Sequence, residues 1–169
     1  MNEEKKVLAI IPAFKVSDHV LDVVGDCLKQ VDHVLVVDDC CPELSGQLVS
    51  EIYATDQRVS VVFHEENRGV GGAMKTGFVW ALEENFFAIV KIDGDGQMDA
   101  SLIPAMLAPL FDGSADYCKG NRFHSPQSIR TMPTARILGN AGLSLLSKFS
   151  TGYWSLNDPT NGFVAASAD

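Results

Sequence analysis

Residues 7–12 have the sequence VLAIIP, a continuous apolar run that ends at Pro12. A strand with one solvated face alternates apolar and polar residues, whereas an unbroken apolar run of this length predicts a strand buried on both faces. Further short runs that favour strands occur at residues 34–37, 59–63, 86–92 and 115–119. The sequence therefore predicts several strands in its first 119 residues, the most apolar of them buried as in a parallel sheet.

Helices are predicted between these strands, over residues 18–29, 42–53, 69–84 and 99–110. Strand and helix thus alternate with short loops, which predicts an α/β domain with three layers, a mostly parallel central sheet and right-handed crossovers. Ligands of such sheets bind beyond the carboxyl ends of the strands. The polar motifs described below follow strands, so they are expected at that edge.

The pattern changes after residue 120. Residues 124–133 are polar, contain two prolines and show no periodicity, so they are predicted to form a loop. A helix is predicted over residues 135–150, a turn over residues 158–162 and the start of another strand over residues 163–166. The chain of 169 residues is long enough to form a single domain with its own core.

Charge is unevenly distributed along the chain. The net charge of −9 argues against a nucleic-acid-binding protein. Residues 1–116 carry 8 basic and 20 acidic side chains, whereas residues 117–157 carry five basic side chains and no acidic one. This basic segment is predicted to meet an anionic group, although a chance run on a solvated surface would have the same composition.

Targeting and cysteine patterns point to the cytoplasm. No apolar run reaches the roughly 18 residues needed to span a bilayer, and the first residues do not form a secretory signal. The four cysteines include no CxxC pair and no Cys/His cluster with zinc spacing. Free thiols in a reducing compartment are therefore expected.

The acidic motif Asp93-Gly94-Asp95-Gly96-Gln97 directly follows the predicted strand at residues 86–92. If the extended geometry continues, Asp93, Asp95 and Gln97 project to one side. Two carboxylates and an amide oxygen are hard ligands suited to Mg²⁺ or Mn²⁺, which completes its shell with phosphates and water. Gly94 and Gly96 would let the backbone approach a bulky ligand. The alternative is an acidic turn that is merely solvated.

Two further motifs follow strands. A carboxylate of Asp38 or Asp39 could accept a hydrogen bond from a nucleoside base or ribose, although one of the two could instead cap a helix. The glycines of residues 69–72 resemble a phosphate-binding helix start, with close packing of the helix on the sheet as the alternative. Neither the P-loop spacing nor the GxGxxG spacing is present.

Taken in order, these motifs resemble those of the family 2 glycosyltransferases with the GT-A fold, a Rossmann-like α/β domain. The matching residues are Ile11-Pro12-Ala13, Val37-Asp38-Asp39, the stretch from Asn67-Arg68-Gly69 to Ala73, and Asp93-Gly94-Asp95-Gly96-Gln97. Within the family the chain resembles the dolichol-phosphate mannosyltransferase branch of polyprenyl-phosphate glycosyltransferases. That narrower match rests on Gly120-Asn121-Arg122-Phe123, on Arg136 opening a helix, and on Asp158-Pro159-Thr160-Asn161-Gly162-Phe163.

The resemblance implies roles for individual residues. One catalytic domain is expected. Its part from about residue 7 to residue 119 is expected to bind a nucleotide-sugar, and its part from about residue 120 to residue 169 is expected to bind the acceptor. The implied nucleotide-sugar ligands are Pro12, Ala13, Asp39, Asn67, Gly69, Asp93 and Gly94; the metal ligands are Asp93, Asp95 and Gln97; the catalytic residues are Asp95, Arg122, Arg136 and Asp158. The arginines, with Arg130, are expected to bind the acceptor phosphate or the leaving diphosphate.

The implied reaction is a metal-assisted, inverting transfer of a hexose from a GDP- or UDP-linked sugar to a polyprenyl or dolichyl phosphate. The full-length protein is expected in the cytoplasm at the inner face of the membrane, and the chain is expected to be truncated after residue 169. One alternative is transfer to a sugar hydroxyl, with Asp158 as general base. Another is a non-catalytic nucleotide-binding domain.

Two stretches depart from the family pattern. Phe14-Lys15-Val16 stands where the family often has Asn-Glu, and Cys40-Cys41-Pro42-Glu43 stands where it often has Gly-Ser-x-Asp. Both are expected near the base of the donor, so the identity of the nucleotide stays open.

Overall fold

The computed structural model describes residues 5–121, 134–152, 154, 158 and 161–168, apart from some side chains of the last helix. Contacts divide the chain into two units, residues 1–118 with 163–169 and residues 119–162, each described below by itself. The elements of the described residues are β1 (Val7–Ala13), α1 (Val20–Cys27), β2 (His33–Asp38), α2 (Ser45–Ile52), β3 (Val59–Phe63), α3 (Gly69–Glu83), β4 (Ala88–Lys91), the 3₁₀ helix η1 (Ala100–Leu102), α4 (Ile103–Phe111), β5 (Tyr117–Lys119), α6 (Thr134–Thr151) and β6 (Val164–Ser167).

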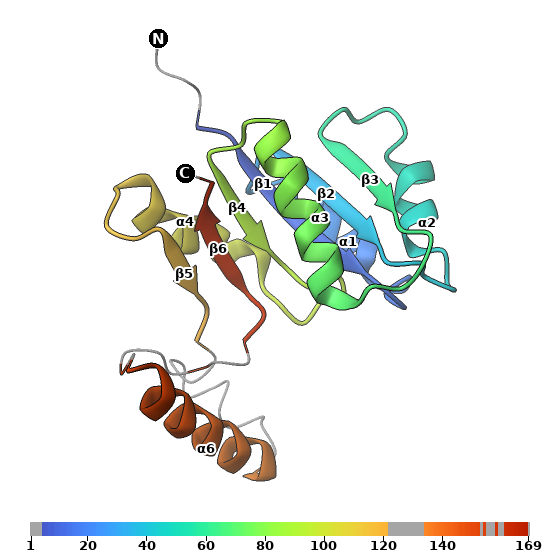
Figure 1. The fold of residues 1–169 in the computed structure, drawn as a ribbon. Coiled ribbons are helices and arrows are strands. Elements are labelled where there is room, and N and C mark those ends of the chain that lie inside the picture. The colour runs from blue at the N-terminus through green and yellow to red at the C-terminus, as the bar shows by residue number, and fades with distance from the viewer. Residues whose placement is uncertain (1–4, 122–133, 153, 155–157, 159–160, 169) are drawn as a thin grey trace. The chain divides into compact units, whose positions relative to one another are not determined.

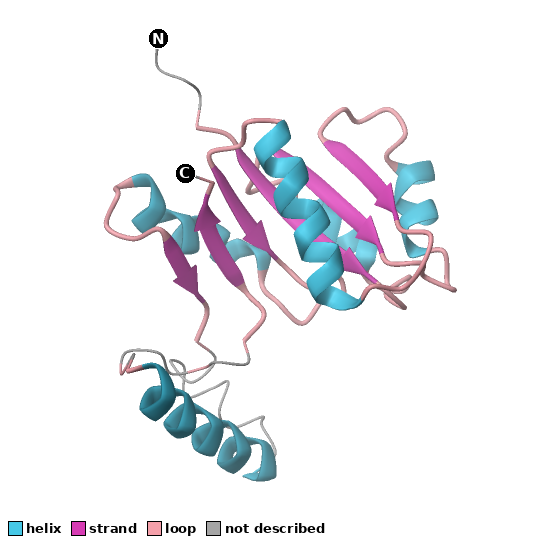
Figure 2. Cartoon of the chain, in the orientation of Figure 1, coloured by secondary structure: helices cyan, strands magenta, loops and turns pink. Residues whose placement is uncertain are grey.

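The central sheet has six strands in the order β3-β2-β1-β4-β6-β5. β1 pairs in parallel with β2 and β4, and β2 pairs in parallel with β3. β6 runs antiparallel to β4, so the sheet is mostly parallel (Figure 2). The predicted α/β class with a mostly parallel sheet is confirmed.

Helices cover both faces of the sheet (Figure 1). Alternate residues of β1 enter two separate cores, with Ala9 and Ile11 in one and Leu8 and Ile10 in the other. The first core includes apolar residues of α1, α2 and α4, and the second includes residues of α3. Burial on both faces explains why the β1 sequence is apolar without alternation.

Two predicted helices begin later in the structure than the sequence indicates. α1 begins at Val20 and not at residue 18, because the carbonyl of Val16 accepts hydrogen bonds from the N–H groups of both His19 and Val20. α2 begins at Ser45 and not near Pro42. The loops that follow β1 and β2 are therefore longer than predicted.

In the second unit, the described residues form α6 and short connecting segments. The helix ends where Gly152 adopts a left-handed conformation, with φ of 75°, and its N–H donates to the carbonyl of Lys148. The ring of Phe149, in the last turn of α6, meets that of Trp154 edge to face, with 5.5 Å between their centroids. The single-domain prediction and its donor and acceptor parts stay predictions.

Candidate functional site

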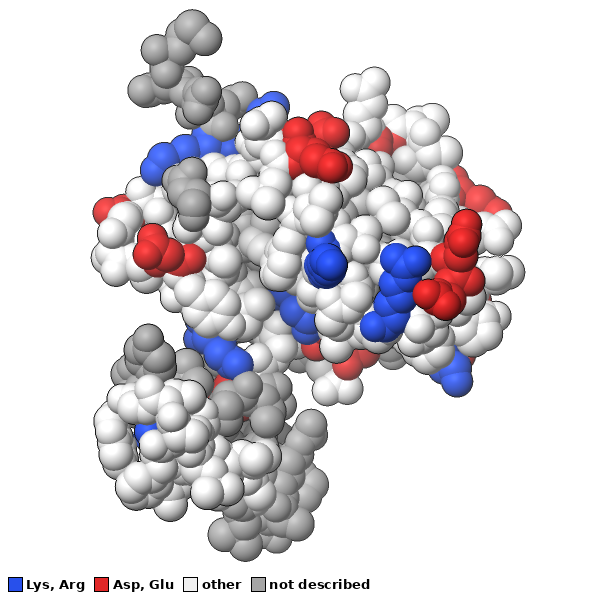
Figure 3. All heavy atoms as spheres, viewed as in Figure 1, with Lys and Arg blue, Asp and Glu red and all other residues white. Residues whose placement is uncertain are grey.

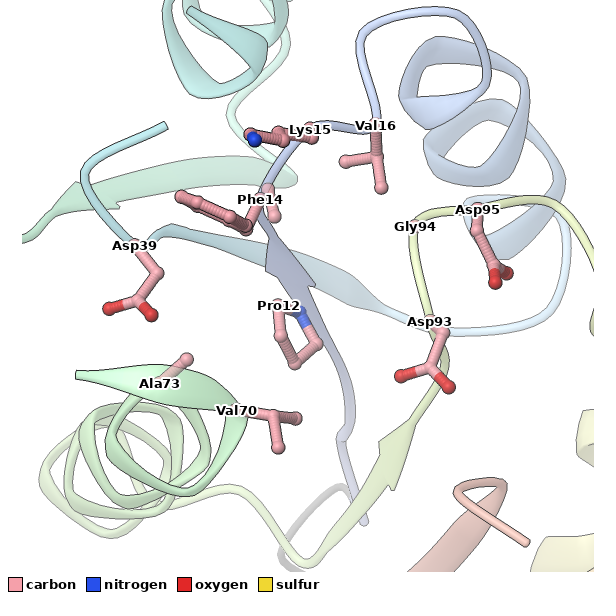
Figure 4. Close-up of a pocket in the computed structure, with 11 residues that line it drawn as sticks. Pro12, Phe14, Lys15, Val16, Asp39, Val70, Ala73, Asp93, Gly94 and Asp95 are labelled. Atoms are coloured by element: carbon pink, nitrogen blue, oxygen red, sulfur yellow. The ribbon is translucent and has the colours of Figure 1, made fainter. Parts of the chain in front are cut away.

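A pocket of about 340 Å³ opens at the carboxyl ends of β1, β2 and β4 (Figure 4). This is the edge at which the sequence predicts ligand binding. The pocket lies wholly within the first unit. Its lining consists of Pro12, Ala13, Phe14, Lys15, Val16, Asp39, Val70, Ala73, Asp93, Gly94 and Asp95.

Six residues predicted to bind the nucleotide-sugar or the metal line this pocket: Pro12, Ala13, Asp39, Asp93, Gly94 and Asp95. β1 lies between β2 and β4 in the sheet, so Pro12 separates Asp39 from the acidic loop (Figure 4). The pocket therefore has one carboxylate on one side of Pro12 and two on the other. Whether these residues bind a nucleotide-sugar stays a prediction.

Asn67, Gly69 and Gln97 are placed differently, since none of them lines the pocket. Asn67 supports Asp39 from behind, because its Nδ2 donates to the Asp39 carbonyl over 3.2 Å and its Oδ1 accepts from the Gly69 N–H over 3.1 Å. Gln97 is exposed, and its backbone N–H donates to Asp95 Oδ1 over 3.1 Å. Asn67 thus contacts the backbone of Asp39 and the Gln97 backbone contacts the Asp95 carboxylate, and the predicted ligand roles of Asn67, Gly69 and Gln97 stay predictions.

The two adjacent aspartates have different surroundings. Asp38 Oδ1 accepts from the Cys41 N–H and Oδ2 accepts from the Gly46 N–H, each over 2.7 Å. Gly46 lies in the first turn of α2, so the Asp38 carboxylate satisfies an N–H at the start of that helix. Asp39 lines the pocket instead. Of the two roles considered from the sequence, helix capping therefore belongs to Asp38, and Asp39 is the one of the pair that is placed to meet a ligand.

Asp39 is held by donors on the pocket's rear wall. Its Oδ1 accepts from the Arg68 N–H over 2.8 Å and lies 2.7 Å from His64 Nδ1. Burial alone would raise the pKa of Asp39, but the hydrogen bonds from Arg68, His64 and the Gly69 backbone outweigh it, so that this pKa lies below its ordinary value. Asp39 is therefore ionised at neutral pH and can only accept hydrogen bonds.

The acidic loop is shaped by contacts within the protein. A Cβ at Gly94 would stand 3.1 Å from Val16 Cγ2 and 3.3 Å from Ile11 Cγ2, and Gly96 has a positive φ of 73°. The sequence assigned both glycines to close approach of a ligand. In the structure Gly94 lets the loop pack against the end of β1, and Gly96 permits a left-handed turn.

Lys91, the last residue of β4, donates through Nζ to Asp93 Oδ1. Its side chain is buried, whereas that of Asp93 is partly open to the pocket. This ion pair offsets one of the two negative charges of the acidic loop. The sequence contained a signal for it, a single charged residue inside the apolar run at residues 86–92.

The chemistry of the acidic loop fits a divalent cation. Among the described residues no group of three or more His, Cys, Asp or Glu side chains is close enough to enclose a metal. Asp93 and Asp95 nevertheless supply hard carboxylate oxygens at the open pocket. Two carboxylates with substrate phosphates and water are the ligands that Mg²⁺ takes in many nucleotide sites. The residues present thus suit a metal that is bound together with its substrate.

The two stretches that depart from the family pattern contact each other. The Lys15 N–H donates to Cys41 Sγ over 3.0 Å, and the Val16 N–H donates to Ser45 Oγ over 3.3 Å. Lys15 has a left-handed φ of 57°, and so have Cys40 and Leu44, with 56° each. These bonds fix a strained loop as one wall of the pocket. The two stretches are therefore joined to each other beside the pocket, which Phe14, Lys15 and Val16 line.

The predicted acceptor residues are less fully described. Arg122 and Arg130 lie outside the described residues. Arg136 is in α6, but its side chain also lies outside the described part. Asp158 is buried within the second unit. Their roles stay predictions. Within the described residues, no helix has the length and apolar character that crossing a membrane requires.

Comparison with known proteins identifies a family and several relatives. The family model described as glycosyl transferase family 2 matches residues 8–166. A UDP-N-acetylglucosamine–dolichyl-phosphate N-acetylglucosaminyltransferase of Methanococcus voltae is 28% identical over 97% of this chain and 70% of its own length. The polyprenol monophosphomannose synthase of Mycolicibacterium smegmatis is 30% identical over 95% of this chain and 61% of its own length. The undecaprenyl-phosphate mannosyltransferase of Micrococcus luteus is 31% identical, over 97% and 67%.

The chain spans between 61% and 70% of the length of these relatives. Two solved structures share its fold. The mannosyltransferase PcManGT from Pyrobaculum calidifontis, in complex with GDP-Man and Mn²⁺, superposes with a TM-score of 0.59 at 18% identity, over 76% of this chain and 39% of that one. Residues 1–349 of TarS from S. aureus superpose with a TM-score of 0.55 at 22% identity, over 66% and 34%. The fold is that of the GT-A glycosyltransferases, and the family match over nearly the whole chain shows that this protein belongs to glycosyl transferase family 2.

Proposed function

We propose that this chain is the catalytic part of an enzyme that transfers a hexose from a GDP- or UDP-linked sugar to a polyprenyl phosphate, with inversion and with the help of Mg²⁺ or Mn²⁺. The observation that carries the proposal is the pocket itself. One buried carboxylate, Asp39, lies on one side of it, and the pair Asp93 and Asp95 lies on the other. Relatives that cover almost the whole chain are named as transferases of dolichyl or polyprenyl phosphate, which supports the lipid acceptor.

Different pocket residues would bind different parts of the nucleotide-sugar. Asp39, as an ionised acceptor, would take an N–H or O–H of the nucleoside. The ring of Phe14 offers an apolar face on the same side of the pocket. Asp93 and Asp95 would hold the metal, which neutralises negative charge on the departing diphosphate. The ion pair with Lys91 holds the Asp93 side chain at the pocket.

On the acceptor side the proposal assigns Arg122 and Arg136, with Arg130, to the phosphate of the lipid. The forked donors of arginine match phosphate oxygens. A phosphate acceptor is already ionised near neutral pH, so that it needs no strong general base. The basic segment at residues 117–157, which has no acidic side chain, is consistent with such a partner.

The donor is tested by measuring thermal stability in the presence of UDP- and GDP-sugars, each with and without Mn²⁺. A ligand at 100 times its dissociation constant stabilises the native state by about 2.7 kcal/mol. We expect one nucleotide class to raise the Tm in a metal-dependent manner. The acceptor is then tested with the full-length protein, by following label from that donor into undecaprenyl phosphate. A lack of stabilisation by every donor contradicts the donor half, and transfer only to sugar hydroxyls contradicts the acceptor half.

The proposal also places the full-length protein at the cytoplasmic face of a membrane. α6 supports this placement, because Leu143, Leu145, Leu146 and Phe149 are all at least half exposed, with Phe149 reaching 70%. On the face seen in Figure 3 the described part of this helix is almost wholly uncharged. Ser144, by contrast, is buried. A helix that turns apolar residues outward, in a basic segment, suits the surface of an anionic bilayer.

Changing Leu146 to aspartate should weaken binding to phosphatidylglycerol vesicles by about tenfold. A buried leucine contributes about 1.5–3 kcal/mol. The matched control is Thr151→Asp, which adds the same charge at an exposed position on the other side of α6 from Leu145, Leu146 and Phe149. Co-sedimentation of the full-length protein measures both variants. Equal loss in the two would assign the effect to charge alone and remove the apolar face from the proposal.

A further inference from the structure

His64 lies directly behind Asp39, at the end of β3. The side chains of both residues are 4% exposed. His64 Nδ1 lies 2.7 Å from Asp39 Oδ1, and His64 Nε2 lies 2.8 Å from Thr76 Oγ1 in α3. The His64 N–H also donates to the Asp38 carbonyl over 2.9 Å. The imidazole therefore connects the pocket carboxylate to the helix that covers this face of the sheet.

The partners determine how the imidazole is used. An ionised carboxylate has no proton to give, so His64 Nδ1 must be the donor to Asp39. In a neutral ring Nε2 is then the acceptor and takes the proton of the Thr76 hydroxyl. In this tautomer the hydrogen bonds form a relay that runs from the Thr76 hydroxyl through His64 to Asp39. Each buried polar atom of the ring has a partner, as the cost of an unsatisfied buried group requires.

The relay fixes which oxygen of Asp39 faces outward. Oδ1 is already used by two donors, the Arg68 N–H at 2.8 Å and His64 Nδ1 at 2.7 Å. The Gly69 backbone N–H also acts on this carboxylate, and among the described residues no hydrogen bond of normal geometry ends on Oδ2. Asp39 lines the pocket (Figure 4). The carboxylate therefore presents one oxygen to the pocket while the other is held from behind.

We propose that His64 is a positioning residue for the donor. It holds the Asp39 carboxylate so that Oδ2 faces the pocket as a fixed acceptor for an N–H or O–H of the donor's nucleoside. The inference rests on the proposed function, since it takes the pocket to be a nucleotide-sugar site. His64 itself touches no donor, because it is buried behind the carboxylate. Without it, Asp39 keeps the Arg68 N–H but loses the restraint on its rotation.

The proposal predicts a defined pattern among four variants. His64→Leu removes both ring hydrogen bonds and should raise the Kd for the donor nucleotide about tenfold, because the Asp39 carboxylate then loses one of its restraints. His64→Asn places an amide N–H where Nδ1 stood, so its Kd should stay within about threefold of the wild type. Thr76→Val removes only the outer partner and should have an intermediate effect.

The matched control is His33→Leu. His33 is partly buried at the start of β2, where it lies 3.0 Å from Ser60 Oγ and 5.2 Å from the ring centroid of Trp80. Its strand leads to the pocket, but it lies at the opposite end of that strand from Asp38. His33→Leu should alter the Tm and leave nucleotide binding unchanged. If His64 had only a structural role, His64→Leu would likewise alter the Tm and leave nucleotide binding unchanged.

Isothermal titration with GDP and with UDP, each with Mn²⁺, measures Kd, and the full-length protein gives KM and kcat for transfer. We expect His64→Leu to raise the donor KM about tenfold and to leave kcat within about twofold, because the proposal gives Asp39 a contact with the nucleoside and assigns the diphosphate to Asp93 and Asp95. An unchanged Kd in His64→Leu and Thr76→Val overturns the inference. If the leucine variant does not fold, a Kd of His64→Asn as weak as that of Asp39→Ala overturns it. If the wild type binds neither nucleotide, the proposed function fails instead.

Discussion

Asp95→Ala should lower kcat/KM for sugar transfer by at least about 100-fold. A metal at the departing diphosphate contributes several kcal/mol to the transition state, and each 1.4 kcal/mol or so changes the rate tenfold. Asp95 lines the pocket, and Lys91 does not pair with it, since that pair is made by Asp93. Asp95 is thus the loop carboxylate that is not neutralised by an ion pair with Lys91, and its loss should weaken metal binding most.

The matched control is Asp99→Ala, in the same loop. Asp99 Oδ1 accepts from the Ser101 N–H over 2.9 Å, and it is exposed. This variant removes the same charge and costs about 1 kcal/mol as a lost cap, but it should leave transfer unchanged. Mn²⁺-dependent donor binding by titration gives a second measurement. Equal donor binding with and without Mn²⁺ in both wild type and Asp95→Ala would contradict a metal site at this loop.

Substitution by asparagine should affect different properties at the two adjacent aspartates: protein stability at Asp38 and nucleotide binding at Asp39. Asp38→Asn is expected to lower the free energy of unfolding by about 2–3 kcal/mol, because hydrogen bonds to charged groups contribute about 1.5–3 kcal/mol. Both oxygens of Asp38 accept a backbone N–H, from Cys41 and from Gly46. An amide has only one oxygen, so its NH₂ must face one of these donors in a buried site.

Asp39→Asn should lower the free energy of unfolding less than Asp38→Asn does, because the hydrogen bonds from Arg68 and His64 both end on Oδ1, which the amide oxygen can replace. The NH₂ group of the new asparagine would then face the pocket, where an N–H of the nucleotide requires a hydrogen-bond acceptor. The Kd for the nucleotide should rise at least about tenfold. Urea unfolding and titration with the nucleotide measure the two effects. Comparable stability losses in the two variants would show that Asp39 has no free oxygen for a ligand.

Much of the fold follows from local sequence. The apolar run of β1 predicts burial on both faces, and its residues do enter two cores. The position of Asp93 and Asp95 after an apolar strand predicts their place at the ligand edge, and both line the pocket. These predictions succeed because the spacing of apolar residues along a strand decides which faces are buried. The strand ends then all lie at one edge of a parallel sheet.

Other parts of the site could not be predicted in this way. Extended geometry predicts that Gln97 projects beside Asp95, but the turn at Gly96, with φ of 73°, comes between them and Gln97 is exposed. The four histidines are scattered along the sequence and give no sign of a cluster. His64 gains its place only because β3 ends beside β2, which brings it to Asp39.

The sequence by itself determined the family, the alternation of strands and helices, and the acidic loop with its expected metal chemistry. The residue pattern alone left open which of Asp38 and Asp39 could meet a ligand, since both follow the same strand, and the family resemblance implied Asp39. Only the tertiary structure shows why Asp38 is used inside the protein while Asp39 lines the pocket, because the donors that distinguish them come from separate elements. Asp38 is held by the start of α2, whereas Asp39 is held by His64 and Arg68, which are 25 and 29 residues away. Hydrogen bonds over such separations depend on how the strands and helices pack, and no local pattern encodes them.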